Sequence, residues 1–253
     1  MKLLRRGFIR LAALAALSAV AAACGIKTKQ VGLTETDTPR TISVSPEAPT
    51  PITLQNENRP ATKPTWNVRF FRPFKALDHR AWRLNIEGMV AEPKKLSLDE
   101  IVCVPSVEQE SRMVCVEGWS CKAKWTGFTY QTLADLVKPS PEATWLYIHC
   151  ADGYYEYLPI ADLLKPRVLF VFRMDGELLP DLFGAPLRLI VPFKWGYKGP
   201  KTITLLRFQD KGGNGYWPTV GLYSSEGTVQ PGIDHPVDLG GRREMQGGEV
   251  TQY

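Results

Sequence analysis

Short alternations of apolar and polar residues recur along the chain from residue 81 onward, a pattern typical of half-buried β-strands. In residues 81–87 the apolar side chains Trp82, Leu84 and Ile86 fall on one face of an extended chain, and polar side chains fall between them. Other segments rich in β-branched and aromatic residues predict further strands. They are residues 111–116, 144–150, 168–174, 187–191 and 202–208. The chain is therefore expected to be built mainly from β-sheet.

Short helices are expected between some of these strands. Ser97 and Glu100 have the spacing of a capping box, so a helix should begin there. In residues 130–137 apolar side chains recur at helical spacing. The tail after Lys211 is rich in glycine and is expected to be irregular. Because strands and helices do not alternate regularly, the pattern predicts an α+β fold with mixed, mainly antiparallel sheets and short helices.

Residues 1–24 have the composition of an export leader and are not expected to belong to the fold. The pair Arg5-Arg6, followed by Gly-Phe-Ile, resembles a twin-arginine signal, whose route exports folded proteins. An ordinary secretory leader with two adjacent arginines is the alternative. Cys24 follows three alanines, as in a bacterial lipobox, which predicts a lipid anchor; an unmodified cysteine is the alternative. The protein is thus predicted to be periplasmic or held at the outer face of a membrane.

The segment after the leader differs in composition from the rest of the chain. Residues 25–64 are rich in Thr, Pro, Gln, Glu and Asn and cannot bury enough apolar surface to fold, which predicts a disordered linker. Residues 65–253 hold all the tryptophans and are long enough for one domain with a substantial core. Loss of the four basic residues of the leader lowers the formal charge from +5 to +1, and no basic patch indicates a nucleic-acid partner.

The sequence RMVCVEGW at residues 112–119 places Cys115 in a short apolar stretch. On its own this pattern is typical of a buried strand with an inert thiol, and a functional thiol is the alternative. An exported protein can also hold disulfides. Cys121 lies near Cys115 and could pair with it in a metal-free form, and Cys103 and Cys150 are the other candidates. The histidines are scattered and no Cys-x-x-Cys pair occurs, which argues against a structural zinc site.

The motif around Cys115 is followed by four others along the chain. They are WTGF at 125–128, GAPLRLIVP at 184–192, WGYKGPK at 195–201 and DHP at 234–236. Together the motifs resemble the molybdopterin-binding domain of the sulfite oxidase superfamily, and within it they are most similar to the periplasmic methionine sulfoxide reductase catalytic subunits. The resemblance covers roughly residues 65–238. It implies a sulfite oxidase-type fold that binds molybdopterin with molybdenum.

The resemblance implies roles for particular residues of this chain. Cys115 matches the cysteine that binds molybdenum, and a soft thiolate suits a metal already held by the dithiolene sulfurs of a pterin. Arg188, Lys198 and Lys201 match positions around the cofactor, where their charges would pair with its phosphate. Gly199 would let the backbone approach the cofactor closely. For the three basic residues, a solvent-exposed place on a strand or loop is the alternative.

Other residues match family positions near the pterin with less specific chemistry. Asn67 resembles an asparagine that contacts the pterin, and Phe70 and Phe71 would line the same wall or pack in the core. Cys150 stands where relatives often carry Thr or Ser, and it could equally be a small core residue. Phe183 stands where the reductase relatives carry an asparagine, which puts one polar contact with the cofactor in doubt.

The resemblance implies an oxidoreductase that transfers an oxygen atom, most similar to enzymes that reduce sulfoxides such as methionine sulfoxide. A membrane partner that contains haem or is linked to quinone would supply the electrons. Arg112 and Lys122 are the basic residues close to Cys115 in sequence, and alternation puts Arg112 on the opposite strand face, whereas sulfite would need several convergent positive donors. Sulfite oxidation is the alternative reaction, and a non-catalytic protein that retains the fold is the alternative from another class.

Overall fold

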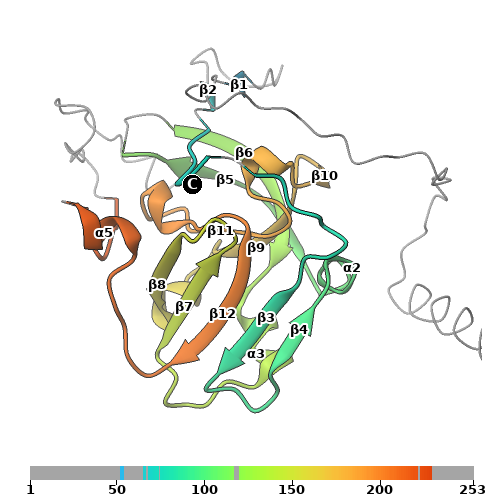
Figure 1. The fold of residues 1–253 in the computed structure, drawn as a ribbon, viewed down its shortest axis with the longest axis vertical. Coiled ribbons are helices and arrows are strands. Elements are labelled where there is room, and N and C mark those ends of the chain that lie inside the picture. Colours follow the sequence, from blue (N-terminus) through green and yellow to red (C-terminus); the bar gives the residue numbers. More distant parts are fainter. Residues whose placement is uncertain are drawn as a thin grey trace, which may run out of the picture. The chain divides into compact units, whose positions relative to one another are not determined.

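The computed structural model of the protein describes residues 52–53, 65–66, 68–73, 75–116, 120–221 and 223–229. The predicted leader, Cys24 and Asn67 lie outside the described residues, and the predicted domain boundaries stay predictions. A short strand, β1 (Ile52–Thr53), falls in the predicted linker and pairs in antiparallel with β2 (Thr65–Trp66). The remaining described strands form two five-stranded sheets (Figure 1).

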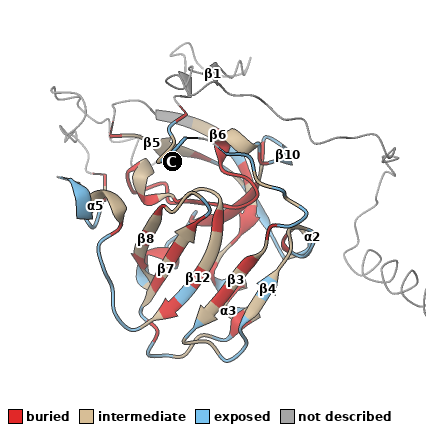
Figure 2. Cartoon of the chain, in the orientation of Figure 1, coloured by how far each residue is buried: buried red, intermediate tan, exposed pale blue. Residues whose placement is uncertain are grey.

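The first sheet is mixed and has the strand order β4-β3-β12-β7-β8. Its strands are β3 (Leu84–Gly88), β4 (Lys94–Leu96), β7 (Trp145–Cys150), β8 (Tyr155–Pro159) and β12 (Ile203–Gln209). β12 runs parallel to β3, and the other described neighbours in this sheet are antiparallel. Buried and half-buried residues alternate along β7 and β8, because one face of the sheet is turned to the core (Figure 2).

The second sheet is antiparallel and has the order β10-β9-β6-β5, with β11 paired to β9. Its strands are β5 (Val107–Val114), β6 (Ser120–Phe128), β9 (Leu169–Met174), β10 (Glu177–Leu178) and β11 (Arg188–Ile190). The predicted turn pair Asp175-Gly176 joins β9 to β10. The predicted α+β class, with mixed and mainly antiparallel sheets, is confirmed.

The helices are short and lie in the connections between strands. They are α2 (Leu98–Ile101), α3 (Tyr130–Val137), α4 (Ile160–Leu163) and α5 (Tyr216–Val220), with the 3-10 turns η1 (Asp181–Phe183) and η2 (Gly196–Lys198). The predicted capping box is present at α2, where the Ser97 hydroxyl accepts from the Glu100 backbone N–H and the Glu100 carboxylate accepts from that of Ser97. α3 has the predicted bounds. In the described part of the chain, none of the helices has the length and apolar character needed to cross a membrane.

The main hydrophobic core lies between the two sheets. Ile148 and Leu206 of the first sheet belong to one buried cluster with Phe128 and Phe170 of the second, and the two phenylalanine rings stack with centroids 5.2 Å apart. From Leu169 to Phe172, successive residues of β9 alternate between this cluster and a second one on the opposite face, which holds Val171. Burial of each such side chain stabilises the fold by about 1.5–3 kcal/mol.

The structure differs from the predicted elements in three ways. β5 ends at Val114, so Cys115 lies one residue beyond the strand in which the sequence placed it. The strands β1, β2, β4, β6, β8 and β10 were not predicted, and in β8 a fully buried Glu156 hides the alternation of polar and apolar residues. The tail after Lys211 is not irregular throughout, because it contains the helix α5.

Candidate active site

A pocket of about 360 Å³ brings together residues from distant parts of the sequence. Most of the predicted site residues line it. They are Phe70, Phe71, Cys115, Arg188, Gly199 and Lys201. Three of the motifs singled out in the sequence therefore meet at one cavity, together with residues that precede the first motif.

Cys115 reaches the pocket from the end of β5. The preceding residue, Val114, forms a parallel bridge with Trp195 of the WGYKGPK motif. Val114 and Trp195 are buried in a small cluster with Val116 and Val229, and the half-buried Cys115 packs against this cluster. The backbone on either side of Cys115 is thus held by buried side chains while its thiol borders the cavity. A metal ligand needs this kind of support to keep its orientation.

Arg188 is buried at the start of β11 and also lines the pocket. Its Nη1 atom donates to the Phe183 carbonyl oxygen at 2.9 Å, and Nη2 lies 3.3 Å from the Met113 sulfur. The guanidinium also lies over the ring of Trp125, with Cζ 5.4 Å from the ring centroid. These contacts fix the plane of the guanidinium and hold a positive charge at the pocket.

Lys201 brings a second positive group to the same pocket. Its ammonium donates to the Arg69 carbonyl oxygen and lies 4.6 Å from the centroid of the Phe70 ring. Removal from solvent and the nearby charge of Arg188 lower the pKa of Lys201 to about 7, and the negative charge of Asp152 opposes this shift only in part. Because the two positive groups repel each other, the pocket favours an anionic ligand that would offset this repulsion.

The rest of the pocket wall is largely aromatic. Phe71 packs edge-on against Tyr154, with ring centroids 5.7 Å apart. Phe183 is buried and lines the pocket, so a ring stands where the family asparagine was expected. At Gly199 a Cβ atom would come within 2.8 Å of the Leu189 carbonyl oxygen. The absence of a side chain there lets this turn pack against β11 and bring its backbone to the pocket.

Other predicted site residues are not brought to the cavity. Cys150 and Lys198 are not among the described residues that line it, and Asn67 lies outside the described residues. Cys150 is fully buried in the main core, where burial raises the pKa of its thiol well above the usual value, and this position fits the small core residue that the sequence left open. Lys198 is also buried, and its ammonium forms an ion pair with Glu156 at 2.6 Å.

Several pocket residues were missed by sequence reasoning. They are Asp152, Tyr154, Tyr197, Trp217 and Tyr223, among others. Tyr197 lies within the WGYKGPK motif, which was the one signal that could have indicated it. The Tyr154 hydroxyl donates to the Tyr197 carbonyl oxygen at 2.6 Å and ties two walls of the pocket together. Trp217 and Tyr223 fall in the glycine-rich tail, which was expected to be irregular.

Comparison with known proteins agrees with the resemblance found in the motifs. Residues 72–217, more than half of the chain, match the family model described as the oxidoreductase molybdopterin binding domain. The chain belongs to this family. Residues 72–217 therefore form an oxidoreductase domain whose cofactor is molybdopterin with molybdenum.

Relatives with assigned names support the same family. A protein of Azospira oryzae, provisionally named protein-methionine-sulfoxide reductase subunit YedZ1, is 37% identical over 145 residues, which cover 57% of this chain and 55% of the relative. The protein-methionine-sulfoxide reductase catalytic subunit MsrP of Ralstonia nicotianae is 35% identical over 176 residues, covering 61% of this chain and 52% of MsrP. The chain thus spans about half the length of these curated relatives.

A solved structure shares the fold. The sulfane dehydrogenase SoxCD from Paracoccus pantotrophus superimposes with a TM-score of 0.51 at 22% identity, over 55% of this chain and 40% of the SoxCD chain. The predicted sulfite oxidase-type fold is confirmed by this likeness.

The residues of the pocket fit the family's cofactor. Cys115 offers a soft sulfur donor of the kind that suits a thiolate-bound metal. Arg188 and Lys201 offer positive groups that can pair with a phosphate. A bound anion would also offset the repulsion between these two positive groups. The aromatic walls formed by Phe70 and Phe71 suit the flat, partly apolar ring system of a pterin.

Proposed function

We propose that the protein reduces sulfoxides, methionine sulfoxide in proteins among them, with molybdopterin bound in this pocket. The observation that carries the proposal is the convergence of Cys115, Arg188 and Lys201, from three separate motifs, on one cavity. The names of the YedZ1 and MsrP relatives support the substrate class. When bound, the cofactor supplies the redox chemistry that removes the oxygen atom of a sulfoxide, with an electron pair from a donor and protons that leave with the oxygen as water.

The protein's own residues would hold and orient the cofactor. In this proposal the Cys115 thiolate binds the metal, and the Arg188 guanidinium offers its fork of N–H donors to the phosphate. Lys201 adds a localised positive charge. Its amine becomes fully protonated when an anion binds beside it, because the anion raises the pKa of Lys201. Phe70 and Phe71 cover the cofactor and exclude water from it, which strengthens every charge interaction within the pocket.

The distribution of positive charge favours a neutral substrate. Arg112, the basic residue closest to Cys115 in the sequence, is not among the residues that line the main pocket and lies instead beside a separate small cavity. Arg188 and Lys201 are taken up by the cofactor phosphate in this proposal. The part of the pocket left to the substrate then holds one basic residue, the exposed Arg69, beside one acidic residue, Asp152, and most of its other residues are aromatic or apolar. This lining suits a neutral, polar sulfoxide better than a doubly charged sulfite.

Steady-state kinetics with two substrates tests this direction of catalysis. We expect kcat/KM for methionine sulfoxide, with a reduced dye as electron donor, to exceed kcat/KM for sulfite, with an electron acceptor, by about a hundredfold or more. Cys115→Ala is the control, because it should remove whichever activity depends on the molybdenum. A larger kcat/KM for sulfite would show that the sulfoxide proposal is wrong while leaving the cofactor assignment intact.

We propose further that the enzyme is exported in folded form and tethered by a lipid at Cys24, facing a membrane donor that contains haem or is linked to quinone. The arginine pair Arg5-Arg6 and the alanines before Cys24 support this location. A folded-protein route suits a cofactor that is inserted before export. The proline-containing segment 25–64 would then hold the catalytic domain away from the lipid surface.

Changes in the leader test the proposed location. With both Arg5 and Arg6 replaced by lysine, we expect cofactor-loaded precursor to accumulate inside the cell, measured by fractionation and molybdenum analysis. With Cys24→Ala, we expect a soluble exported form or an unprocessed precursor. A Cys24→Ala protein that stays in the membrane at the processed size of the wild type would rule out the lipid anchor.

A further inference from the structure

Residues 223–229, here called the strap, follow α5 and run beside the pocket. Tyr223 at one end lines the pocket. Val229 at the other end is buried in the small cluster against which Cys115 packs. The strap therefore contacts both the wall of the pocket and the support of the proposed metal ligand. It lies outside residues 72–217, which match the family model.

The backbone of the strap is hydrogen-bonded to the segment before η2. The Trp195 backbone N–H donates to the Gly227 carbonyl oxygen at 2.8 Å, and the Val229 N–H donates to the Phe193 carbonyl oxygen at 3.0 Å. Gly227 has a φ of +64°, and a Cβ atom there would lie 2.6 Å from the Lys198 Cγ atom. The strap thus passes directly over the Lys198 side chain, at a point where only glycine fits well.

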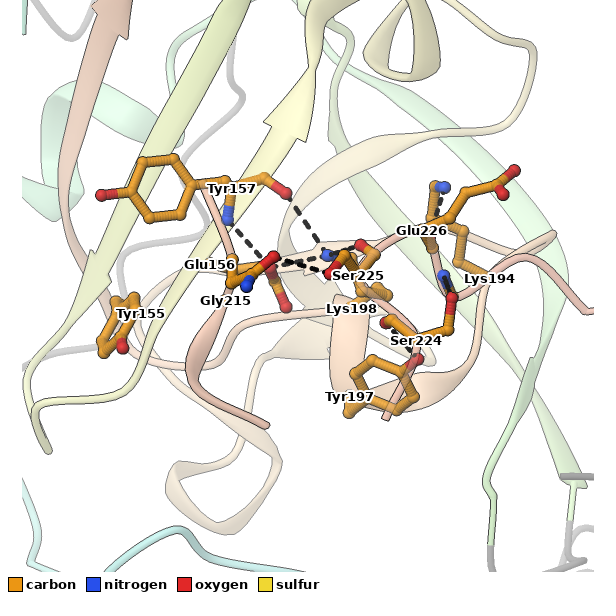
Figure 3. A network of polar contacts seen from close by, with 12 residues as sticks. Tyr155, Glu156, Tyr157, Lys194, Tyr197, Lys198, Gly215, Ser224, Ser225 and Glu226 are labelled. Carbon is orange, nitrogen blue, oxygen red and sulfur yellow. Dashed lines mark hydrogen bonds and ion pairs between the residues drawn. The ribbon is translucent and has the colours of Figure 1, made fainter. Parts of the chain in front are cut away.

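The Lys198 ammonium forms a buried ion pair and a hydrogen bond to the strap. Its ammonium lies 2.6 Å from Oε1 of Glu156, and the side chains of both residues are almost completely buried (Figure 3). The same ammonium donates to the Ser225 carbonyl oxygen at 2.8 Å and to the Tyr157 carbonyl oxygen at 3.3 Å. An ammonium group has three N–H donors, and these contacts use all three. Lys198 therefore has no donor left for a cofactor phosphate, the role that the sequence predicted for it.

Lys194 repeats the arrangement four residues earlier. Its buried ammonium lies 2.8 Å from Oδ2 of Asp162 and donates to the Glu226 carbonyl oxygen at 2.6 Å and to the Thr228 hydroxyl at 3.3 Å. Two adjacent carbonyl groups of the strap thus accept from two buried ammonium groups. Each ammonium is held in place by a carboxylate from β8 or α4.

The same segment shapes the wall of the pocket. The Tyr197 hydroxyl donates to the Ser224 carbonyl oxygen at 2.7 Å, and the Tyr197 ring packs edge-on against Tyr223 with centroids 5.2 Å apart. Tyr223 in turn lies 5.2 Å from the Trp217 ring. Since Tyr197, Trp217 and Tyr223 all line the pocket, any displacement of the strap would move this aromatic wall.

We propose that Lys198 is a positioning residue that, together with Lys194, fastens the strap so that Tyr223 closes one wall of the pocket and Val229 supports Cys115. Charge-assisted hydrogen bonds to backbone carbonyl groups are stronger than neutral ones and have little dependence on the side chains of the strap. The inference rests on the proposed function only for the identity of what the pocket holds. The fastening itself is a property of the folded chain.

Hydrogen exchange of the full-length, cofactor-loaded protein tests the fastening, because the Trp195 and Val229 amides report directly on the strap. The decisive variant is Lys198→Met with Glu156→Gln, which removes the strap contact without leaving a charged carboxylate buried alone. We expect exchange at both amides to accelerate about tenfold or more, the loss that one charge-assisted hydrogen bond produces. Exchange in β7 and β12 should stay unchanged. Lys198→Met alone should accelerate exchange over the whole domain as well, because it leaves Glu156 unpaired.

Two further variants separate positioning from general destabilisation. Gly227→Ala displaces the strap from its own side, because its Cβ atom would press on the Lys198 Cγ atom, but it keeps both charges of the ion pair, and it should accelerate the same two amides. Arg207→Met breaks the exposed ion pair with Glu87 and serves as the matched control, with no expected change at the strap. In activity assays the double variant should raise KM for a sulfoxide several-fold with a smaller change in kcat.

The outcomes decide between the possibilities without relying on catalysis. Strap amides that exchange at the wild-type rate in both the double variant and Gly227→Ala would overturn the inference. A uniform acceleration over all strands in the double variant would also overturn it, because Lys198 would then serve general stability only. If the strap behaves as expected but no sulfoxide is reduced, the proposed function fails and the fastening stands.

Discussion

Replacing Cys115 by alanine is expected to abolish sulfoxide reduction, with a loss of about a thousandfold or more in kcat/KM, the scale seen when a group at the reacting centre is removed. Cys115 is the sulfur donor at the pocket, and a metal that loses its thiolate ligand changes its charge and geometry. The fold should survive, because the residue is only half-buried and the surrounding cluster of Val114, Trp195 and Val229 is untouched. Thermal unfolding should therefore shift by no more than a few degrees.

An exposed cysteine provides the matched control for this substitution. Cys103→Ala should keep full activity, since Cys103 is exposed and is not among the residues that line the pocket. Activity is to be compared at equal concentrations of folded protein, measured by circular dichroism. Wild-type activity in Cys115→Ala would remove the central role assigned to this thiol.

Replacing Lys201 by methionine is expected to weaken retention of the cofactor by about tenfold to a hundredfold, the effect of losing one charge-assisted hydrogen bond. Methionine has a similar length and keeps the packing against Phe70, so the charge is the main loss. Molybdenum content after extended dialysis measures retention. Lys124→Met, which removes an exposed lysine paired with Glu108, is the control and should retain molybdenum like the wild type.

The pH dependence of stability gives an independent test of Lys201 in the cofactor-free protein. Its pKa in the folded state is about 7, below the value of about 10.4 in an unfolded chain, so between these values the unfolded state binds more protons. The free energy of unfolding should therefore rise as the pH increases from about 7 to about 10. Lys201→Met should lose this part of the rise. An identical pH profile in both proteins would show that the Lys201 pKa is not lowered.

The sequence patterns predicted the strands and helices whose apolar residues face a single core. The alternation around Leu84 and the helical spacing in residues 130–137 both correspond to observed elements, because burial on one face leaves a clear period. The strand β8 escaped this reasoning. Its inward positions hold Leu158 and a charged Glu156, while Tyr155 and Tyr157 point outward, so polarity does not follow burial there.

The sequence motifs limited how much of the site could be predicted. Cys115, Arg188 and Lys201 all line the pocket, in agreement with the resemblance. Lys198 lies three residues before Lys201, and nothing in the local sequence distinguishes the two lysines. The difference arises from Glu156, a residue distant in sequence, which captures the Lys198 ammonium in the interior. Such a long-range partner leaves no signature in the spacing of a motif.

The most direct test of the central claim is X-ray absorption at the molybdenum edge of the matured, full-length protein and its Cys115→Ala variant. We expect molybdenum in both proteins, because Arg188, Lys201 and the pocket walls still hold the pterin. The variant should show one sulfur ligand fewer than the wild type. The same number of sulfur ligands in both proteins, or no molybdenum in the matured wild type, would contradict the assignment of Cys115 as the ligand of a molybdenum cofactor.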